Sequence, residues 1–327
     1  MNKRRAVLLL LAILALASAL GSWRLLPMKH VEGHEIRVTT DDADQYSPAI
    51  YGSLISYIHE DVVADIHLYN ISSGRHISVT DDVHNQYVND IWDRKIVYGD
   101  ARGGNSNILI FDLMEGRELL IDSGVEHRIF PAIGERYIVW QEFVDGYYQI
   151  MLYDMEEGEK IQLTHDAGNH KYPRISGERV VWQAEEEEGE WGIFLHTIGE
   201  NSTARIGELT GSQISPDIHG DRVVFLQLIE DSFHVYLYDI SAGKLTRITR
   251  EGAGKQNPSI HGGLIVWEDL RNGNFDIYAY DLARGKEIQI TDDPSDQYLS
   301  DVHGERIVYT DDRNGNMDIY MYEYSTR

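Results

Sequence analysis

Gln289-Ile-Thr-Asp-Asp-Pro-Ser-Asp-Gln-Tyr-Leu-Ser-Asp-Val-His-Gly-Glu-Arg-Ile-Val-Tyr-Thr-Asp-Asp-Arg-Asn-Gly-Asn-Met-Asp-Ile-Tyr-Met-Tyr322 is the stretch that decides the fold, because six imperfect copies of it precede it in the chain. Two series of aromatic positions mark the repeat. The first closes an apolar run and comprises Tyr57, Tyr98, Trp140, Trp182, Phe225, Trp267 and Tyr309. The second lies in an Ile-Tyr-x-Tyr pattern and comprises Tyr69, Phe111, Tyr153, His196, Tyr238, Tyr280 and Tyr322. Both series advance by 41 to 43 residues per step, so the chain contains seven repeats.

Each repeat is predicted to consist of short β-strands. Runs such as Val-Val-Trp182 and Ile-Val-Tyr309 are β-branched and aromatic, and Asp276–Leu282 alternates in polarity between turn formers. A unit of about 42 residues fits four antiparallel strands, which is the size of one propeller blade. We therefore expect an all-β fold, a seven-bladed β-propeller in which the first aromatic series fills the space between neighbouring blades.

Turn residues punctuate the repeat at two places. Asn272-Gly273 and Asn314-Gly315 follow the second predicted strand and are typical of two-residue hairpins, whose central residues both have positive φ. A glycine also follows the third strand in five repeats, at Gly74, Gly116, Gly158, Gly243 and Gly285. The fourth repeat lacks this glycine and has Glu200-Asn201-Ser202-Thr203 nearby.

The two ends of the repeat array complement each other. His34–Thr40 is similar to the fourth strand of other repeats, such as Lys286–Thr291, whereas the last repeat ends after its third strand near Tyr322. The N-terminal strand can therefore complete the last blade and cover the sheet edges that a linear array would leave open. We expect a ring closed in this way, with the propeller occupying residues 34–327.

Residues 1–30 differ from the rest of the chain. Lys3-Arg4-Arg5 is a basic region, Ala6–Leu20 is an apolar run of 15 residues, and Ala17-Ser18-Ala19 offers small side chains to a signal peptidase. This pattern predicts a signal peptide or, if it is not cleaved, an N-terminal membrane anchor. We expect an extracytoplasmic protein, which is periplasmic, secreted or at the cell surface and meets the membrane only through this segment.

The composition narrows the classes of function. The chain has no cysteine, which excludes thiol catalysis, cysteine–zinc sites and iron–sulfur clusters. Its 29 basic and 54 acidic residues give a net charge of −25, which argues against nucleic acid as a partner because phosphate binding needs a basic surface. A cationic ligand or partner would be attracted. The alternative is a solvated acidic surface without a specific partner.

Two segments carry a family resemblance. Trp267–Leu282 and Tyr309–Tyr320 resemble the WD40-like repeats of the TolB propeller family, in particular those of exported archaeal and bacterial surface proteins. The resemblance extends over roughly Glu35 to Tyr322. It implies a β-propeller used for protein contacts or ligand binding outside the cytoplasm. Because propellers host many chemistries, the resemblance specifies the fold far better than the function.

Catalytic motifs are absent from the sequence, which has no Gly-x-Ser-x-Gly elbow, no His-Glu-x-x-His pair and no Walker loop. His219, His261 and His303 recur at one position of the repeat. Since each falls in a different blade, we expect them to diverge around the ring and to be structural rather than metal ligands. Asn70 and Asn201 begin Asn-x-Ser/Thr sequons and are candidate glycan acceptors in an exported protein.

The most suggestive cluster lies in the loops before the first strand of repeats 1, 2 and 7, which ring closure would make neighbours. These loops share an Asp-Asp pair followed by Gln-Tyr. The candidate binding residues are Asp41, Asp42, Gln45, Tyr46, Asp81, Asp82, Gln86, Tyr87, Asp292, Asp293, Gln297 and Tyr298. We expect them to lie at the same end as the loops after the second strand and to bind calcium, which prefers oxygen ligands, or a cationic partner. The alternative is that recent duplication left the three loops alike.

These observations favour an exported, non-catalytic binding or scaffold protein with no firm cofactor. Two alternatives remain: a propeller enzyme of the polysaccharide lyase or hydrolase type that acts on an extracellular polymer, and a structural cell-surface protein. The enzyme would need metal ligands or paired acid–base groups that converge in the channel, so the discriminating observation is whether histidine and carboxylate side chains meet there. The structural protein would have no concave ligand pocket.

Overall fold

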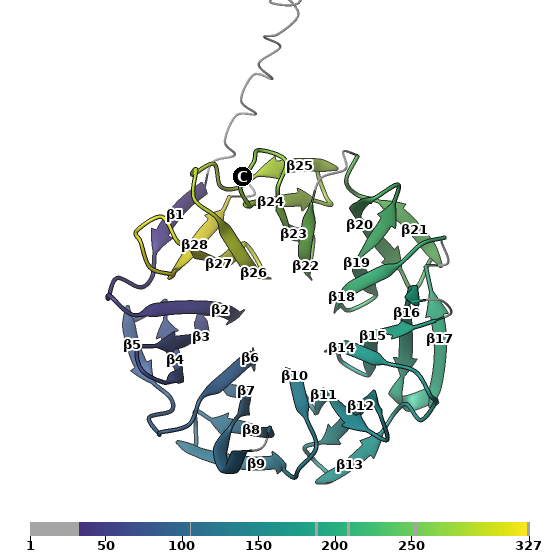
Figure 1. Cartoon of the computed structure of the whole chain (residues 1–327). Coiled ribbons are helices and arrows are strands. Elements are labelled where there is room, and N and C mark those ends of the chain that lie inside the picture. Colours follow the sequence, from purple (N-terminus) through teal and green to yellow (C-terminus); the bar gives the residue numbers. More distant parts are fainter. Residues whose placement is uncertain (1–32, 105, 187–188, 208–209, 251–253, 326–327) are drawn as a thin grey trace, which may run out of the picture. The chain divides into compact units, whose positions relative to one another are not determined.

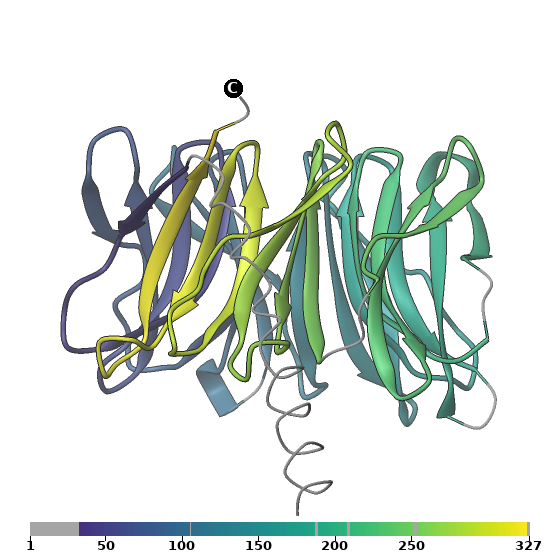
Figure 2. The same ribbon diagram turned by 90° about the horizontal axis from the view of Figure 1, so that it is seen from above.

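A computed structural model describes residues 33–325 except 105, 187–188, 208–209 and 251–253. The strands of this part form seven four-stranded antiparallel sheets around one axis, so the predicted seven-bladed β-propeller is confirmed (Figure 1). Figure 2 shows the ring from its side, where the strands run from one end of the ring to the other. The predicted export segment, residues 1–30, lies outside the described residues. Among those residues, no helix has the length and hydrophobicity needed to cross a membrane.

Blades 1 to 7 each contribute an inner strand and a second strand. The inner strands, nearest the axis in Figure 1, are β2 (Asp44–Tyr51), β6 (Gln86–Trp92), β10 (Arg128–Ile133), β14 (His170–Ser176), β18 (Gln213–His219), β22 (Lys255–His261) and β26 (Gln297–His303). The second strands are β3 (Leu54–Glu60), β7 (Lys95–Asp100), β11 (Tyr137–Val144), β15 (Arg179–Glu185), β19 (Arg222–Ile229), β23 (Leu264–Asp269) and β27 (Arg306–Asp311).

The third and outer strands complete the sheets. The third strands are β4 (Ala64–Asn70), β8 (Asn107–Asp112), β12 (Tyr147–Asp154), β16 (Trp191–Thr197), β20 (Ser232–Asp239), β24 (Asp276–Asp281) and β28 (Asp318–Tyr324). The outer strands are β5 (Arg75–Ser78), β9 (Arg117–Asp122), β13 (Glu159–Gln162), β17 (Ser202–Ile206), β21 (Lys244–Arg247), β25 (Lys286–Gln289) and, for blade 7, β1 (Gly33–Arg37). Short 3₁₀ turns lie at Arg102–Gly104 and Ile198–Glu200.

The N-terminal strand closes the ring, as predicted. β1 pairs antiparallel with β28, from Gly33 opposite Tyr324 to Arg37 opposite Tyr320. The strand ends at Arg37, before the predicted end at Thr40. Thr39 still holds the closure together, because its hydroxyl accepts a hydrogen bond from the Ile319 amide at 2.8 Å.

The first aromatic series fills the blade interfaces, as predicted. None of its seven side chains is more than 2% exposed. Trp182 of blade 4, for example, packs with Val139, Ile150 and Leu152 of blade 3. Burial of one large ring per interface contributes a few kcal/mol each, so the repeat supplies a core between every pair of blades.

Every inner strand carries a β-bulge that the sequence pattern did not predict. The ladder shifts register at the third residue of the strand, or at the fourth in β2. This residue has positive φ in each blade although it is never glycine: Ser47, Val88, Phe130, Tyr172, Ser215, Asn257 and Leu299. A bulge bends its strand and redirects the side chains that follow. In this protein the bulge lies between the start of each inner strand, which follows the loop from the preceding blade, and the last residues of that strand, whose side chains lie near the axis.

The predicted two-residue hairpins are wrong. Asp269 pairs with Asp276 and Asp311 with Asp318, so the loops between them contain six residues. Only the glycines of these loops have positive φ, 102° at Gly273 and 95° at Gly315. The preceding asparagine is held instead by its side chain: Asn314 donates to the Asp318 carboxylate at 2.9 Å and to the Tyr320 hydroxyl at 2.8 Å.

Asn201 replaces the glycine that repeat 4 lacks. The five glycines after the third strand have φ of 58° to 72°, and Asn201 has φ of 49° at the matching turn. Asparagine tolerates this left-handed region better than other side chains do. We therefore expect Asn201→Gly to leave the free energy of unfolding within about 0.5 kcal/mol, and Asn201→Val to lower it by roughly 1–2 kcal/mol. Urea unfolding measures both, and equal stability of the two variants would contradict the assignment.

Candidate functional site at the ring axis

The last residues of the inner strands place carboxyl, guanidinium and hydroxyl groups near the axis of the ring. The second residue after the bulged one is Ala49, Asp90, Ala132, Arg174, Asp217, Ser259 or Asp301 in blades 1 to 7. We call Asp90, Arg174, Asp217, Ser259 and Asp301 the axial cluster. These side chains project from the innermost strands, yet solvent still reaches them, since Asp217 is 18% and Arg174 40% exposed. The axial cluster is therefore partly buried in the protein but remains accessible from solution.

The three carboxylates of the axial cluster also join the blades. Asp90, Asp217 and Asp301 each accept a hydrogen bond from a backbone amide in the next blade, at 2.8 to 2.9 Å. The Ser259 hydroxyl donates to Asp301 Oδ1 at 3.1 Å and also interacts with the Asp217 carboxyl. Arg174 Nε lies 3.9 Å from Asp217 Oδ1. Asp217 and Asp301 are thus paired across one hydroxyl, with a single guanidinium beside them.

The surroundings raise the pKa of all three carboxyls. Burial is the main cause for Asp90, Asp217 and Asp301, and for Asp301 the negative charges of Asp90 and Asp217 add to it. The pKa of Asp301 rises to about 7. Amide and hydroxyl donors pull in the other direction but do not cancel the effect. Asp301 can therefore exchange a proton near neutral pH, which is the property that general acid–base catalysis needs.

Two residues further along the inner strands, five aromatic rings form an arc around the axis. His219 contacts His261 with ring centroids 4.1 Å apart, and His261 contacts His303 at 4.0 Å. Tyr51 continues the arc at 4.8 Å from His303, and Trp92 follows at 4.8 Å from Tyr51. The expectation that the three histidines diverge is therefore wrong. Blades converge toward the axis, so the ends of neighbouring inner strands lie within contact distance.

The histidines of the arc are neutral and structurally engaged. Nδ1 of His219 and of His261 accepts the backbone amide of Gly262 and of Gly304, respectively, each in the next blade. An accepting Nδ1 places the proton on Nε2. Burial lowers the pKa of all three histidines, that of His261 to about 4. His219 and His261 therefore each join their blade to the next one, and the three histidines lie closer together than the sequence predicted.

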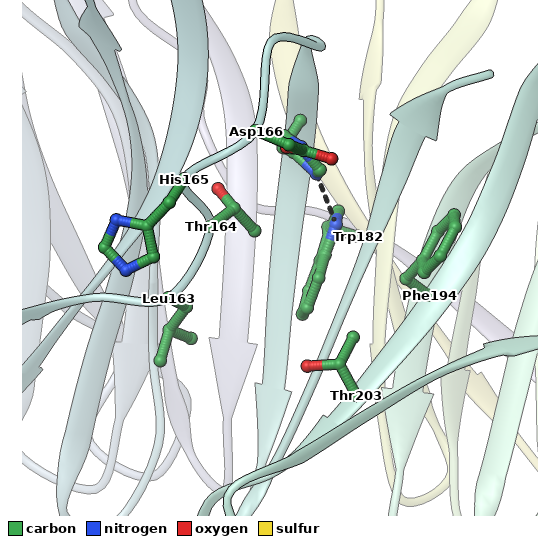
Figure 3. A pocket seen from close by; sticks show the side chains of 8 residues that line it. Leu163, Thr164, His165, Asp166, Trp182, Phe194 and Thr203 are labelled. Atoms are coloured by element: carbon green, nitrogen blue, oxygen red, sulfur yellow. Dashed lines mark hydrogen bonds and ion pairs between the residues drawn. The ribbon is translucent and has the colours of Figure 1, made fainter. Parts of the chain in front are cut away.

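A pocket of about 230 Å³ lies away from the axis, between blades 3 and 4 (Figure 3). Leu163, Thr164, His165 and Asp166 line it from the loop after β13, and His170, Trp182, Phe194 and Thr203 line it from blade 4. The Trp182 indole donates to His170 Nδ1 at 2.9 Å, and His170 Nε2 contacts Asp166 Oδ1. This chain fixes the histidine tautomer with its proton toward Asp166.

The predicted acidic loops lie at the end of the ring that the sequence indicated. Asn316, in the loop after β27, donates to the backbone oxygens of Asp41 and Ala43, so the two kinds of loop do share one end. The alignment of the loops is corrected by one residue: Asp41, not Asp42, matches Asp82 and Asp293. All three accept the amide two residues later.

The structure separates the twelve predicted binding residues into four groups, of which Asp41, Asp82 and Asp293, with their loop amides, are the first. Asp42, Asp81 and Asp292 are exposed, while Gln45, Gln86 and Gln297 are buried below their loops, where each side-chain amide donates to a loop carbonyl. The tyrosines are half-buried: Tyr46 donates to Glu60, Tyr87 to the Arg128 carbonyl, and Tyr298 has its pKa raised to about 12, mainly by burial.

Within the described ranges, no group of three or more histidine and acidic side chains is arranged to hold a metal ion. The acidic loops therefore supply no such set for calcium, and neither the axial cluster nor the histidines of the arc provide one.

Of the two candidate glycan acceptors, Asn70 uses its side-chain oxygen to accept the Ser73 amide at 3.1 Å. Asn201 is exposed at the left-handed turn described above. Glycosylation of both residues stays a prediction.

No family model and no curated protein matches the chain. Solved structures do match its fold. Oligogalacturonate lyase from Vibrio parahaemolyticus is 12% identical with a TM-score of 0.72, and the match covers 91% of this chain and 98% of that one. The β-propeller domain of the trilobed protease from Pyrococcus furiosus, described as having an open velcro topology, is 16% identical with a TM-score of 0.70, covering 88% and 95%. TolB from Acinetobacter baumannii is 15% identical with a TM-score of 0.57, covering 73% and 64%.

The expectation of a non-catalytic platform is corrected by these findings. Structures that match this chain almost end to end are described as oligogalacturonate lyases, one of them in complex with manganese. The side chains of the residues that the structure describes do not offer a ligand set for such a metal ion. The carboxyl groups of Asp217 and Asp301 nevertheless converge on Ser259 at the axis, as the enzyme alternative requires, whereas the three histidines contact one another. At the level of the fold, the resemblance to TolB propellers is confirmed, because TolB is among the solved structures that match this seven-bladed propeller.

Proposed function

We propose that this protein is a propeller enzyme that cleaves an extracellular polysaccharide by acid–base chemistry at the axial cluster. The observation that carries the proposal is the pair Asp217 and Asp301 on either side of Ser259, with Arg174 beside it and a pKa of about 7 for Asp301. The near end-to-end match to lyases of the same fold supports it, as does the export pattern in residues 1–30.

Each member of the cluster has a role in this proposal. Asp301 takes a proton from the sugar or from water, since its pKa lies near neutral pH. Asp217, whose pKa burial also raises, returns a proton to the leaving glycosidic oxygen. Arg174 stabilises negative charge that develops on the substrate. The aromatic arc, with Tyr51 and Trp92 at one end, gives a sugar ring an apolar face to pack against.

The experiment is a screen of acidic and neutral polysaccharides with two readouts. New reducing ends report cleavage by either route, whereas an absorbing carbon–carbon double bond forms only in elimination. On any substrate that is cleaved, Asp301→Asn is expected to lower kcat by about 100-fold or more. Exposed Asp61→Asn is the matched control and should leave kcat unchanged.

A second variant separates catalysis from structure. Ser259→Ala removes a donor that favours ionised Asp301, so the pKa of Asp301 should rise further. Because the base is the ionised form, the rate should then reach its plateau at a higher pH, with the melting temperature nearly unchanged. An unaltered pH profile, or full activity of Asp301→Asn on a cleaved polymer, would overturn the assignment.

A further inference from the structure

Each blade has a space beside the buried aromatic of its second strand, under the loop that enters the blade, which we call the slot. In blades 2, 3, 6 and 7 an ion-pair network fills the slot, and in blade 4 it does not. In blade 7, Arg313 lies there, 2.9 Å from Glu35 and in contact with Asp311. Blade 6 repeats the arrangement with Arg271, Asp269 and Glu287, and blade 2 with Arg102, Asp100 and Glu118. Blade 3 uses Lys160 and Arg128 with Asp122 and Glu142.

In blades 6 and 7 the guanidinium also lies over an aromatic ring. Arg271 is 4.2 Å from the ring centroid of Tyr278, and Arg313 is 4.4 Å from that of Tyr320. Each of these tyrosines in turn stacks on the buried aromatic of the second strand, at 6.2 Å for Trp267 and 6.0 Å for Tyr309. A cation in such a place gains from the ring face as well as from the carboxylates.

Blade 4 keeps the ring pair but lacks the cation. Phe194 stacks on Trp182 at 6.3 Å and 14°, as the tyrosines do in blades 6 and 7. Counted from the buried aromatic of the second strand, Ala184 matches Asp311 of blade 7, and Glu186 matches Arg313. On the outer strand, the pairing of the strands shows that Thr203 matches Glu35. Glu186 pairs with Arg205 at 2.8 Å instead of filling the slot. The pocket of about 230 Å³ occupies this place, and no lysine or arginine of the described chain lines it.

One carboxylate of the slot is also kept. Asp166 matches Asp82 and Asp293 in the entering loops, and those residues lie 3.2 Å from Arg102 and 3.9 Å from Arg313, respectively. Asp166 is 73% exposed at the mouth and holds His170 through one oxygen, and a carboxylate has acceptor capacity for a further donor. The pocket volume exceeds the roughly 30 Å³ share of one water molecule several-fold.

We propose that the pocket between blades 3 and 4 binds the guanidinium group of an external arginine, in the place where blades 2, 6 and 7 hold an arginine of their own. The flat face of the guanidinium group packs against the ring of Phe194, and N–H groups of the guanidinium donate hydrogen bonds to the Asp166 carboxylate. The net charge of −25 attracts such a ligand. The site is separate from the axial cluster and does not depend on the proposed catalysis.

The test is ligand-observed NMR with arginine amide as the probe and citrulline amide, its neutral isostere, as the control ligand. Arginine amide should bind with a millimolar or lower dissociation constant, and citrulline amide at least tenfold more weakly. An acetylated Gly-Gly-Arg-Gly amide peptide distinguishes the two sources of the group. Tighter binding of the peptide indicates an arginine of a protein partner, and equal binding indicates a small guanidinium compound; both support the pocket.

Variants localise the binding. Asp166→Asn and Phe194→Leu should each weaken arginine amide binding by tenfold or more, whereas exposed Asp61→Asn should not change it. Thr203→Lys places an ammonium group in the slot, as Lys160 does in blade 3, and should abolish binding while the protein stays folded. Equal binding of the charged and neutral amides, or undiminished binding in Thr203→Lys, would overturn the proposal.

Discussion

A protein that begins at residue 41 is expected to be less stable than one that begins at Val31 by roughly 5 kcal/mol or more, a large share of the stability of a typical domain. The deletion removes β1 and leaves the edge of β28 unpaired. It also removes Glu35, which accepts from the buried Tyr309 hydroxyl and from Arg313. A buried hydroxyl and a guanidinium would both lose a partner, in addition to the apolar contacts of Val38 with Val308 and Ile319.

The measurement is urea unfolding of both proteins, with size-exclusion chromatography to detect association through the exposed edge. Glu35→Ala in the protein that begins at Val31 is a finer variant, because it keeps the strand and should cost about 1–3 kcal/mol. Coincident unfolding midpoints for the two starting points would show that the ring does not depend on this strand.

The architecture was predictable because the same pattern of strands and aromatic residues recurs in every repeat. The aromatic series gives the blade count, and the strand that the chain has in excess at His34–Thr40 matches the strand missing after Tyr322. Local detail was less secure. Asn272-Gly273 indicated a two-residue hairpin, but Asn272 binds Asp276 and Tyr278 with its side chain, which stabilises a six-residue loop instead. Both partners lie within six residues of the asparagine, so the signal is the repeated Asn-Gly-Asn-x-Asp-Ile-Tyr pattern rather than the Asn-Gly pair alone.

The axial cluster was missed although its signal is in the sequence. Asp217-Ile-His219 and Asp301-Val-His303 share one pattern, and Asp90-Ile-Trp92 differs only in the ring. A spacing of one repeat predicts separation around the ring. Separation depends on radius, however, and inner strands lie where the radius is smallest, so His261 and His303 touch. The number of repeats gives the rotation about the ring axis that separates equivalent residues. The distance between them also depends on how far their strand lies from the axis, and it is smallest for the inner strands.

The pocket of blade 4 shows the opposite case, in which a departure from the repeat is the signal. Glu186 stands four residues after Trp182, where the corresponding position in blades 2, 6 and 7 is arginine. That difference could be read from the sequence. The matching loss of an outer-strand carboxylate at Thr203 could not, because it follows from the pairing of Thr203 with His196 and of Glu35 with Tyr322.

Glu268→Gln is expected to stabilise the propeller at pH 8 by roughly 1–3 kcal/mol, which would raise the melting temperature by several degrees. Glu268 is 1% exposed, and burial raises the pKa of its carboxyl to about 7. Its Oε1 accepts the bulged Leu299 amide of blade 7 at 2.5 Å. Gln141 and Gln183 make the same bond to Tyr172 and Ser215 at 2.8 Å, so a glutamine fits this position without rearrangement.

The pH dependence identifies the cause of this stabilisation. The pKa of Glu268 is higher in the folded state than the ordinary glutamate value of 4.5, so the folded protein binds this proton more tightly than the unfolded chain does. The stabilising contribution is complete below pH 4.5 and is lost as the pH rises through about 7. The advantage of Glu268→Gln should therefore be near zero at pH 4, grow across this window and stay constant above it. Gln183→Glu is the reverse variant and should lose stability over the same range. A pH-independent difference in either variant would assign the effect to packing rather than to the buried charge.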